Sequence, residues 1–245
     1  MKKISSPHFN ERKTPVDMLV LHSTAHNAAG AVQSLLNNEV SAHYVIDLDG
    51  EVYSLVDEDK RAWHAGVASW RNINTDLNSR SVGIEVCNLS LGQTPYGEKQ
   101  ISRLVRLCRK LIRSYHIRPE MIVAHSDIAP TRKPDPGIAF PWQYLAQKGI
   151  GLWYKPQNAQ KIKEASVPEL LKTIGYNTDT PETTIASAYA FRRRFLPEEV
   201  EIIEDVKQLV DNVYPQNCTR LLQGEKFINT LKAVAYAYLN ASKKP

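Results

Sequence analysis

The chain has 245 residues, 42% of them hydrophobic and 23% charged, with three cysteines and a formal net charge of +5. These proportions are typical of a folded globular protein and exclude an intrinsically disordered one. The sequence has no apolar run near the roughly 20 residues of a transmembrane helix, no signal peptide is predicted after Met1-Lys2-Lys3, and the widely spaced cysteines predict neither a disulfide framework nor a cysteine zinc site.

The first predicted elements are a strand, a helix and a hairpin. Residues 18–21 form an apolar run that predicts a buried strand, which ends directly before His22. Residues 28–36 are predicted to form a short amphipathic helix. Two strands, 42–47 and 51–56, then flank Leu48-Asp49-Gly50. Asp-Gly tolerates the positive φ angles of a tight turn, so this pattern predicts a hairpin.

A loop with several aromatic residues follows the hairpin. It contains Trp63 and His64, and Trp70 lies a few residues further on. Two tryptophans and a histidine in a polar loop are typical of a wall that contacts a sugar or peptide ligand. The alternative is that these side chains cap the edge of the core, and the sequence does not decide between the two interpretations.

The segment 81–88 alternates as a strand with one buried face. Val82, Ile84 and Val86 share the face predicted to be covered by a helix, which directs Glu85 to the opposite face. A carboxylate among small residues in mid-strand is costly unless it is solvated or partnered by a cation or water. Glu85 is therefore either a cleft residue or a plain solvent-facing glutamate.

The sequence between 98 and 142 predicts an amphipathic helix, a strand and a loop. Apolar residues recur with helical period over 98–115, and the strand 121–124 follows and leads into His125. The segment 125–142 is too rich in proline and glycine to be helix or inner strand. Asp135 stands between two prolines, two residues after Lys133.

These loop residues have a chemical interpretation and a structural one. Since His22 and His125 both follow strands, they are expected to meet at one edge of the sheet. A histidine, an aspartate and a lysine can supply two zinc ligands and a cation for an oxyanion. The alternative is a stiff surface loop after a core strand.

The last third of the sequence predicts helices without catalytic groups. A short helix from Phe140 to about Gln147 precedes a candidate linker, 149–166. Beyond it the sequence predicts a helical bundle of its own, with helices at 167–174, 181–195, 203–213 and 224–239. We therefore expect an α/β domain over residues 1–155 and a small helical domain over 166–245.

Five motifs together resemble the zinc-dependent type 2 N-acetylmuramoyl-L-alanine amidases, the AmiD-like and AmpD-like enzymes related to peptidoglycan recognition proteins. In chain order the motifs are L-V-L-H-S-T-A, S-A-H-Y-V-I-D-L-D-G-E-V-Y, A-W-H-A-G, S-V-G-I-E-V-C-N and A-H-S-D-I-A-P-T-R-K-P-D-P-G. The resemblance implies a mixed central sheet flanked by helices. The segments L-L-K-T-I-G-Y-N and A-Y-A-F-R-R-R-F resemble a helical peptidoglycan-binding module.

The resemblance also implies roles for individual residues. His22, His125 and Asp135 correspond to the zinc ligands, which leave a fourth coordination position for water, as in catalytic zinc sites. Glu85 corresponds to the catalytic glutamate that moves the water proton, and Lys133 would stabilise the negatively charged oxygen. Residues in the cleft segments are expected to bind substrate, without individual roles: Tyr44, Trp63, His64, Trp70 and Asn88. A fourth-ligand role for His64 is disfavoured because it would displace the water.

The implied activity is hydrolysis of the amide between N-acetylmuramic acid, or its 1,6-anhydro form, and L-alanine. Residues 166–245 have equal numbers of basic and acidic residues, so the positive excess lies in the first 165 and suits peptidoglycan or muropeptide fragments that carry carboxylates. The basic residues are scattered, and nucleic acid is not predicted. We expect a monomer in the periplasm or cell envelope, or alternatively in the cytoplasm. The rival functions are a non-catalytic peptidoglycan recognition protein and a metallopeptidase.

Overall fold

A six-stranded mixed sheet forms the centre of the molecule. The computed structural model describes residues 1–241, and the strands lie in the order β1-β5-β4-β7-β3-β8. The strands have these bounds: β1 Lys2–Lys3, β3 Met18–Thr24, β4 Tyr44–Ile46, β5 Val52–Ser54, β7 Ser81–Cys87 and β8 Ile122–Ala124. The four strands β4, β7, β3 and β8 run parallel, and β5 pairs antiparallel with β4. The predicted fold class is confirmed.

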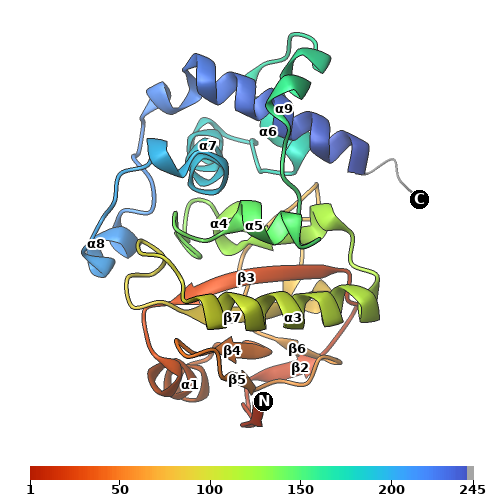
Figure 1. The fold of residues 1–245 in the computed structure, drawn as a ribbon, viewed down its shortest axis with the longest axis vertical. Coiled ribbons are helices and arrows are strands. Elements are labelled where there is room, and N and C mark those ends of the chain that lie inside the picture. Colours follow the sequence, from red (N-terminus) through yellow and green to blue (C-terminus); the bar gives the residue numbers. More distant parts are fainter. Residues whose placement is uncertain (242–245) are drawn as a thin grey trace.

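Helices cover both faces of this sheet (Figure 1). The long helix α3, Glu98–Tyr115, packs against the face that carries Val82, Ile84 and Val86. On the other face, α1, Ala28–Asn37, packs against Val45 and Cys87. The predicted alternation of β7 is therefore confirmed, and Glu85 lies on the face opposite α3.

The predicted hairpin is confirmed, whereas several shorter elements, among them β2, β6 and α2, were not predicted. Strands β4 and β5 flank a turn in which Gly50 has a φ of 86°, the left-handed region that favours glycine. A separate two-stranded sheet pairs β2, Phe9–Glu11, with β6, Lys60–Ala62, and α2 is a single helical turn, Leu77–Arg80. Each of these elements has three or four residues, too few to show a hydrophobic period.

The segment after β8 corrects one expectation from the sequence. The 3-10 turn Pro119–Met121 leads into β8, and the next four residues form the one-turn helix α4, His125–Ile128. The prolines that argued against a helix begin only at Pro130, so they do not prevent this turn. His125 is consequently the first residue of a helix and is held at the end of β8.

The C-terminal part is helical, as predicted, but it does not pack separately. It contains three short 3-10 turns and five helices with these bounds: α5 Trp142–Gln147, 3-10 Pro156–Lys161, α6 Val167–Ile174, α7 Pro181–Phe195, 3-10 Pro197–Glu199, α8 Val206–Asp211, 3-10 Thr219–Leu222 and α9 Glu225–Ala241. One continuous core joins Trp70 near the sheet to Tyr176 and Tyr238 among these helices. The expectation of a bundle of its own is therefore wrong.

The candidate linker, 149–166, also differs from the expectation. Trp153 and Tyr154 stack near Phe195 of α7, and the 3-10 turn Pro156–Lys161 packs against α9. Its aromatic residues give the segment packing partners that its Gly, Gln, Asn and Lys content did not suggest. The domain limits, 1–155 and 166–245, stay a prediction, and residues 242–245 lie outside the described part of the chain.

A buried ion pair connects the helical part to the residues next to His125. Arg194 of α7 pairs with Asp127 of α4, and the two side chains are 1% and 0% exposed. Asp127 also accepts a hydrogen bond from the hydroxyl of Tyr176 at 2.6 Å and one from the backbone N–H of Ala124 at 2.9 Å.

Within residues 1–241, none of the helices combines the length and apolar character that crossing a membrane requires.

Candidate metal centre and active site

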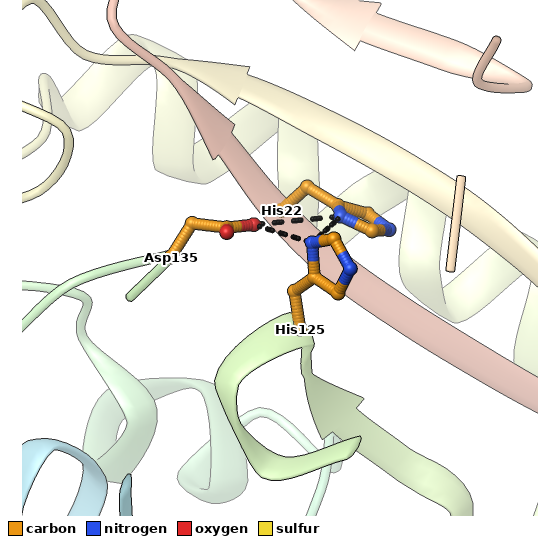
Figure 2. Close-up of side chains that lie close together, drawn as sticks. All are labelled: His22, His125 and Asp135. Atoms are coloured by element: carbon orange, nitrogen blue, oxygen red, sulfur yellow. Dashed lines mark hydrogen bonds and ion pairs between the residues drawn. The ribbon is translucent and has the colours of Figure 1, made fainter. Parts of the chain in front are cut away.

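Three predicted ligands converge at one edge of the sheet (Figure 2). His22 lies in β3, His125 begins α4 after the neighbouring strand β8, and Asp135 comes from the loop that follows. The Nδ1 atoms of the two histidines are 2.9 Å apart. The Oδ2 atom of Asp135 lies 3.1 Å from Nδ1 of His125 and 3.4 Å from Nδ1 of His22.

This arrangement fits a bound metal ion. Ligand atoms at tetrahedral positions about 2.1 Å from one ion lie about 3.4 Å from each other, close to the three distances given above. Nε2 of His125 is 3.3 Å from the carbonyl oxygen of Ala65, which can only accept a hydrogen bond. When the neutral ring of His125 carries its proton on Nε2, its Nδ1 presents a lone pair to the carboxylate of Asp135. A cation between this lone pair and the carboxylate would stabilise the contact.

The electrostatics of the cluster favour metal-binding protonation states. Burial, together with the nearby His125, lowers the pKa of His22 to about 4, so the ring is neutral near pH 7. Burial alone would raise the pKa of Asp135, but interactions with His125 and His22 outweigh it and hold that pKa well below its usual range. Neutral imidazoles and an ionised carboxylate are the forms that bind metals.

Glu85 lies beside the cluster on the adjacent strand. It is in register with His22, and its Oε1 is 4.0 Å from Nδ1 of that residue. Burial, with a further contribution from the charge of Asp135, raises the pKa of Glu85 to about 8. Its buried Oε2 has no hydrogen-bond partner within the described residues. Such a carboxyl group can exchange a proton near neutral pH.

Lys133 acts on the same cluster through its charge. Its ammonium group opposes the rise in the pKa of Glu85 and adds to the fall in the pKa of His22. In both cases its effect is smaller than that of burial. The side chain is half-buried, two residues before Asp135. Lys133 thus supplies a positive charge near the carboxylates.

His64 is brought to the site, but behind His22. Its Nδ1 is 3.0 Å from Nε2 of His22, whereas the ligand cluster faces Nδ1 of His22. A ring on the far side of a ligand cannot share its metal. The rival interpretation of His64 as a fourth ligand therefore does not fit the structure, and its 9% exposure also argues against a substrate contact.

The positions of Tyr44 and Trp70 contradict the expectation that these side chains contact substrate. Tyr44 is in register with Ile84, so it faces α3, and its hydroxyl donates to Glu58. Trp70 is 0% exposed, contacts Tyr176 and Tyr238 edge to face, and donates from its indole to the carbonyl of Glu120. The interpretation of Trp70 as a core residue is the one that fits the structure.

Trp63 and Asn88 are likewise held by structural contacts. The indole of Trp63 donates to Asn10 at 2.6 Å in the small two-stranded sheet. The side-chain oxygen of Asn88 accepts from Ser90 and from the backbone of Gly92, which shapes the loop after β7. That loop accepts a hydrogen bond from Ala139 through the Gly92 carbonyl, and so supports the turn after Asp135. These contacts give Trp63 and Asn88 structural roles, and their contact with substrate stays a prediction.

Two contributors next to the cluster were not predicted as site residues. Ala65 orients His125 through its backbone carbonyl, and Ser81 bonds to His64. The alternation of β7 already placed Ser81 on the face of Glu85. Nothing in the sequence indicated that the loop with His64 would lie over that face.

An α/β fold with two imidazoles and one carboxylate at the end of parallel strands, next to a carboxyl group of raised pKa, defines a protein with a candidate metal site equipped for acid–base chemistry. Comparison of the sequence with protein families identifies an amidase family, which agrees with a site for acid–base chemistry. The chain belongs to the N-acetylmuramoyl-L-alanine amidase family, whose model matches residues 12–138.

The relatives of the chain include two named amidases. N-acetylmuramoyl-L-alanine amidase AmiD of Escherichia coli K12 is 37% identical over 209 residues, which cover 74% of this chain and 75% of AmiD. The 1,6-anhydro-N-acetylmuramyl-L-alanine amidase AmpD of Enterobacter cloacae is 45% identical over 103 residues, 42% of this chain and 54% of AmpD. The similarity to AmiD thus extends over much more of the chain.

Solved structures show the same fold over nearly the whole chain. AmiD from E. coli, in complex with anhydro-N-acetylmuramic acid-L-Ala-D-gamma-Glu-L-Lys, superposes with a TM-score of 0.71 at 29% identity and covers 94% of this chain and 92% of that one. AmpDh3 from Pseudomonas aeruginosa superposes with a TM-score of 0.73 at 29% identity, covering 91% and 92%. Both the sheet and the C-terminal helices therefore have counterparts in these neighbours.

Proposed function

We propose that this chain is a zinc-dependent N-acetylmuramoyl-L-alanine amidase. It would hydrolyse the amide between the lactyl group of N-acetylmuramic acid, or its 1,6-anhydro form, and the L-alanine of the stem peptide. The observation that carries the proposal is the convergence of His22, His125 and Asp135 beside Glu85. The relatives and neighbours named above support the choice of bond, because their names or bound ligands contain this linkage.

The donor set supports zinc as the metal. Two imidazole nitrogens and one carboxylate oxygen are a set that zinc accepts, and three protein ligands are typical of catalytic zinc sites. Zinc held there would supply a Lewis acid that polarises a carbonyl and lowers the pKa of water.

The residues of the chain would then have distinct parts in the reaction. Glu85 takes a proton from the attacking water and gives it to the leaving amine of L-alanine, which converts the amide to a carboxylic acid and a free amine. Lys133 stabilises the negative charge that develops on the amide oxygen. A carboxyl group whose pKa is raised to about 8 suits a role in which a proton is both accepted and released.

The wider setting of this activity is also part of the proposal. We expect a monomer that acts on peptidoglycan or on muropeptide fragments, in the cell envelope or, for imported fragments, in the cytoplasm. The helical residues 166–245 are proposed to bind the wall polymer, which would raise the local concentration of cleavable bonds.

Incubation of the purified, zinc-loaded protein with defined muropeptides tests the proposal. Mass spectrometry of the products should show a free peptide that begins with L-alanine and a sugar that retains its lactyl group. Removal of zinc with a chelator should stop the reaction, and added zinc should restore it. Cleavage within the stem peptide would indicate a metallopeptidase instead, and binding without any cleavage would indicate a recognition protein.

A further inference from the structure

A chain of hydrogen-bonding groups extends from His22 away from the ligand cluster. Nδ1 of His22 faces His125 and Asp135, while Nε2 of the same ring is 3.0 Å from Nδ1 of His64. Nε2 of His64 is in turn 3.1 Å from the hydroxyl oxygen of Ser81. The side chains of His22, His64 and Ser81 are all buried.

The hydrogen bonds of Ser81, at the far end of this series of contacts, determine where the protons of the series lie. The hydroxyl of Ser81 is 2.7 Å from the backbone carbonyl of Leu77, and a carbonyl oxygen can only accept. The proton of the Ser81 hydroxyl is therefore used in that bond. The same oxygen can then accept a hydrogen bond from Nε2–H of His64.

The proton positions on His64 and then on His22 follow from this bond. A neutral His64 with its proton on Nε2 has a bare Nδ1, which accepts from Nε2–H of His22. His22 then presents the lone pair of Nδ1 to the cluster. We propose that His64, oriented by Ser81, is a positioning residue that fixes the metal-binding tautomer of His22. This inference rests on the metal site proposed above, but not on which amide the enzyme cleaves.

The surroundings of His64 are shaped to hold the ring in this place. A Cβ atom added to Gly83 of β7 would lie 2.5 Å from Cγ of His64, so only a glycine admits the imidazole against the strand. The side-chain oxygen of Asn78 accepts from the backbone N–H groups of His64, at 3.0 Å, and Ala65, at 2.8 Å. Both the ring and its backbone are therefore fixed.

The same short loop serves both histidine ligands. The side chain of His64 accepts from Nε2 of His22, and the carbonyl of Ala65, the next residue, accepts from Nε2 of His125. Partners of this kind hold a metal-binding imidazole in one orientation and one tautomer. His64 and Ala65 of the A-W-H-A-G segment are thus assigned to ligand positioning.

The tautomer itself is measurable. Two-dimensional 15N–1H correlation spectra of the histidine rings in the zinc-loaded protein report which nitrogen of each ring carries the proton. We expect His64 to carry its proton on Nε2 alone. A proton on Nδ1 of His64, alone or together with Nε2, would place two donors face to face with His22 and would overturn the proposal.

A matched pair of variants tests the consequence for metal affinity. Asn and Leu have the same branched shape, but in His64→Asn the side-chain oxygen takes the place of Nδ1 as acceptor, whereas His64→Leu provides none. Measured by competition with a chromophoric chelator, zinc affinity should fall about 10- to 100-fold in His64→Leu, the usual loss when such a partner is removed, and His64→Asn should restore most of it.

Further measurements separate this proposal from a general loss of stability and from failure of the metal site. Ser187→Ala removes another buried hydroxyl, in α7, and should leave zinc affinity unchanged. Melting temperatures of the metal-free variants report folding on their own. Wild-type affinity in a folded His64→Leu would contradict the positioning role, and if that variant does not fold, the ring spectra of the wild type decide. A wild-type protein that binds no zinc would instead refute the proposed function.

Discussion

At the scale of single residues, Glu85 has surroundings that differ from those of an ordinary, solvated glutamate. Parallel in-register pairing of β3 and β7 puts it directly beside His22, with a buried oxygen that has no hydrogen-bond partner among residues 1–241. Water solvates an ordinary carboxylate, but burial here favours the protonated form and raises the pKa of Glu85 to about 8. This group is therefore suited to proton transfer.

Replacement of Glu85 by Gln tests that role. The amide keeps the shape of the side chain but cannot take and release a proton, so the rate of muropeptide cleavage should fall about 10²- to 10⁴-fold. The zinc content of the purified variant should stay at the wild-type level, because Glu85 is not among the three converging ligands. Rates are compared by chromatography of the released peptide. A variant that kept its zinc and cleaved at a normal rate would remove Glu85 from the reaction.

The residues of the site were predictable to different degrees, for reasons of geometry. The sequence placed His22 and His125 directly after strands, and parallel pairing of Leu21 with Ala124 brings these next residues together, although β3 itself continues to Thr24. Tyr44 could not be placed in this way. Its direction depends on register with Ile84, which is set by pairing between segments far apart in sequence.

At the scale of secondary-structure elements, a polar cluster around Glu58 joins the segment after β5 to helix α3. The carboxylate accepts from Lys110 and from the hydroxyl of Tyr115, both at 2.8 Å, and from the hydroxyl of Tyr44. Burial raises the pKa of Glu58, but hydrogen bonds from these three groups outweigh it, and the net effect lowers that pKa from the ordinary value of 4.5. The cluster therefore stabilises the folded state when Glu58 is ionised.

The pH dependence of stability follows from the direction of this shift. A carboxyl whose pKa is lower in the folded than in the unfolded state adds stability above its unfolded pKa and loses it as the pH falls through the folded value. Glu58→Gln should lower the melting temperature most near pH 7, and its difference from wild type should shrink below the ordinary pKa of 4.5. Thermal unfolding between pH 7 and 3 measures this. Glu204→Gln, at an exposed site, is the control, and a difference independent of pH would contradict the prediction.

Element boundaries were predictable where local signals were complete. The observed bounds of α3, α6 and α7 match those expected from periodicity and helix-start residues, and the starts of α6 and α7 have capping boxes at Ser166 and Thr180. Helix α8 is shorter than expected and begins after Asp205, whose side chain caps it. One-turn helices such as α4 depend on their surroundings, since Tyr176 and Arg194, far away in sequence, hold Asp127 of this one.

At the scale of the whole molecule, the two parts of the chain share contacts that local patterns did not indicate. Trp70 packs against Tyr176 and Tyr238, and Asp127, two residues after His125, is paired with Arg194 of α7. The sequence indicated a change of composition near residue 149, but a change of composition does not show which surfaces pack together. The helical part therefore supports the segment that carries a candidate metal ligand.

This continuity predicts that the molecule unfolds as one unit. Arg194→Met leaves the buried carboxylate of Asp127 without its cation, which should cost about 3–5 kcal/mol. Because the core is continuous, calorimetry should show a single transition that moves as a whole to lower temperature. In Lys226→Met, which breaks the exposed pair with Glu198 elsewhere in the helical part, the loss should stay below about 1 kcal/mol. Two separate transitions, with only one moved by Arg194→Met, would instead mean that the helices fold on their own and that the pair at Asp127 does not stabilise the sheet.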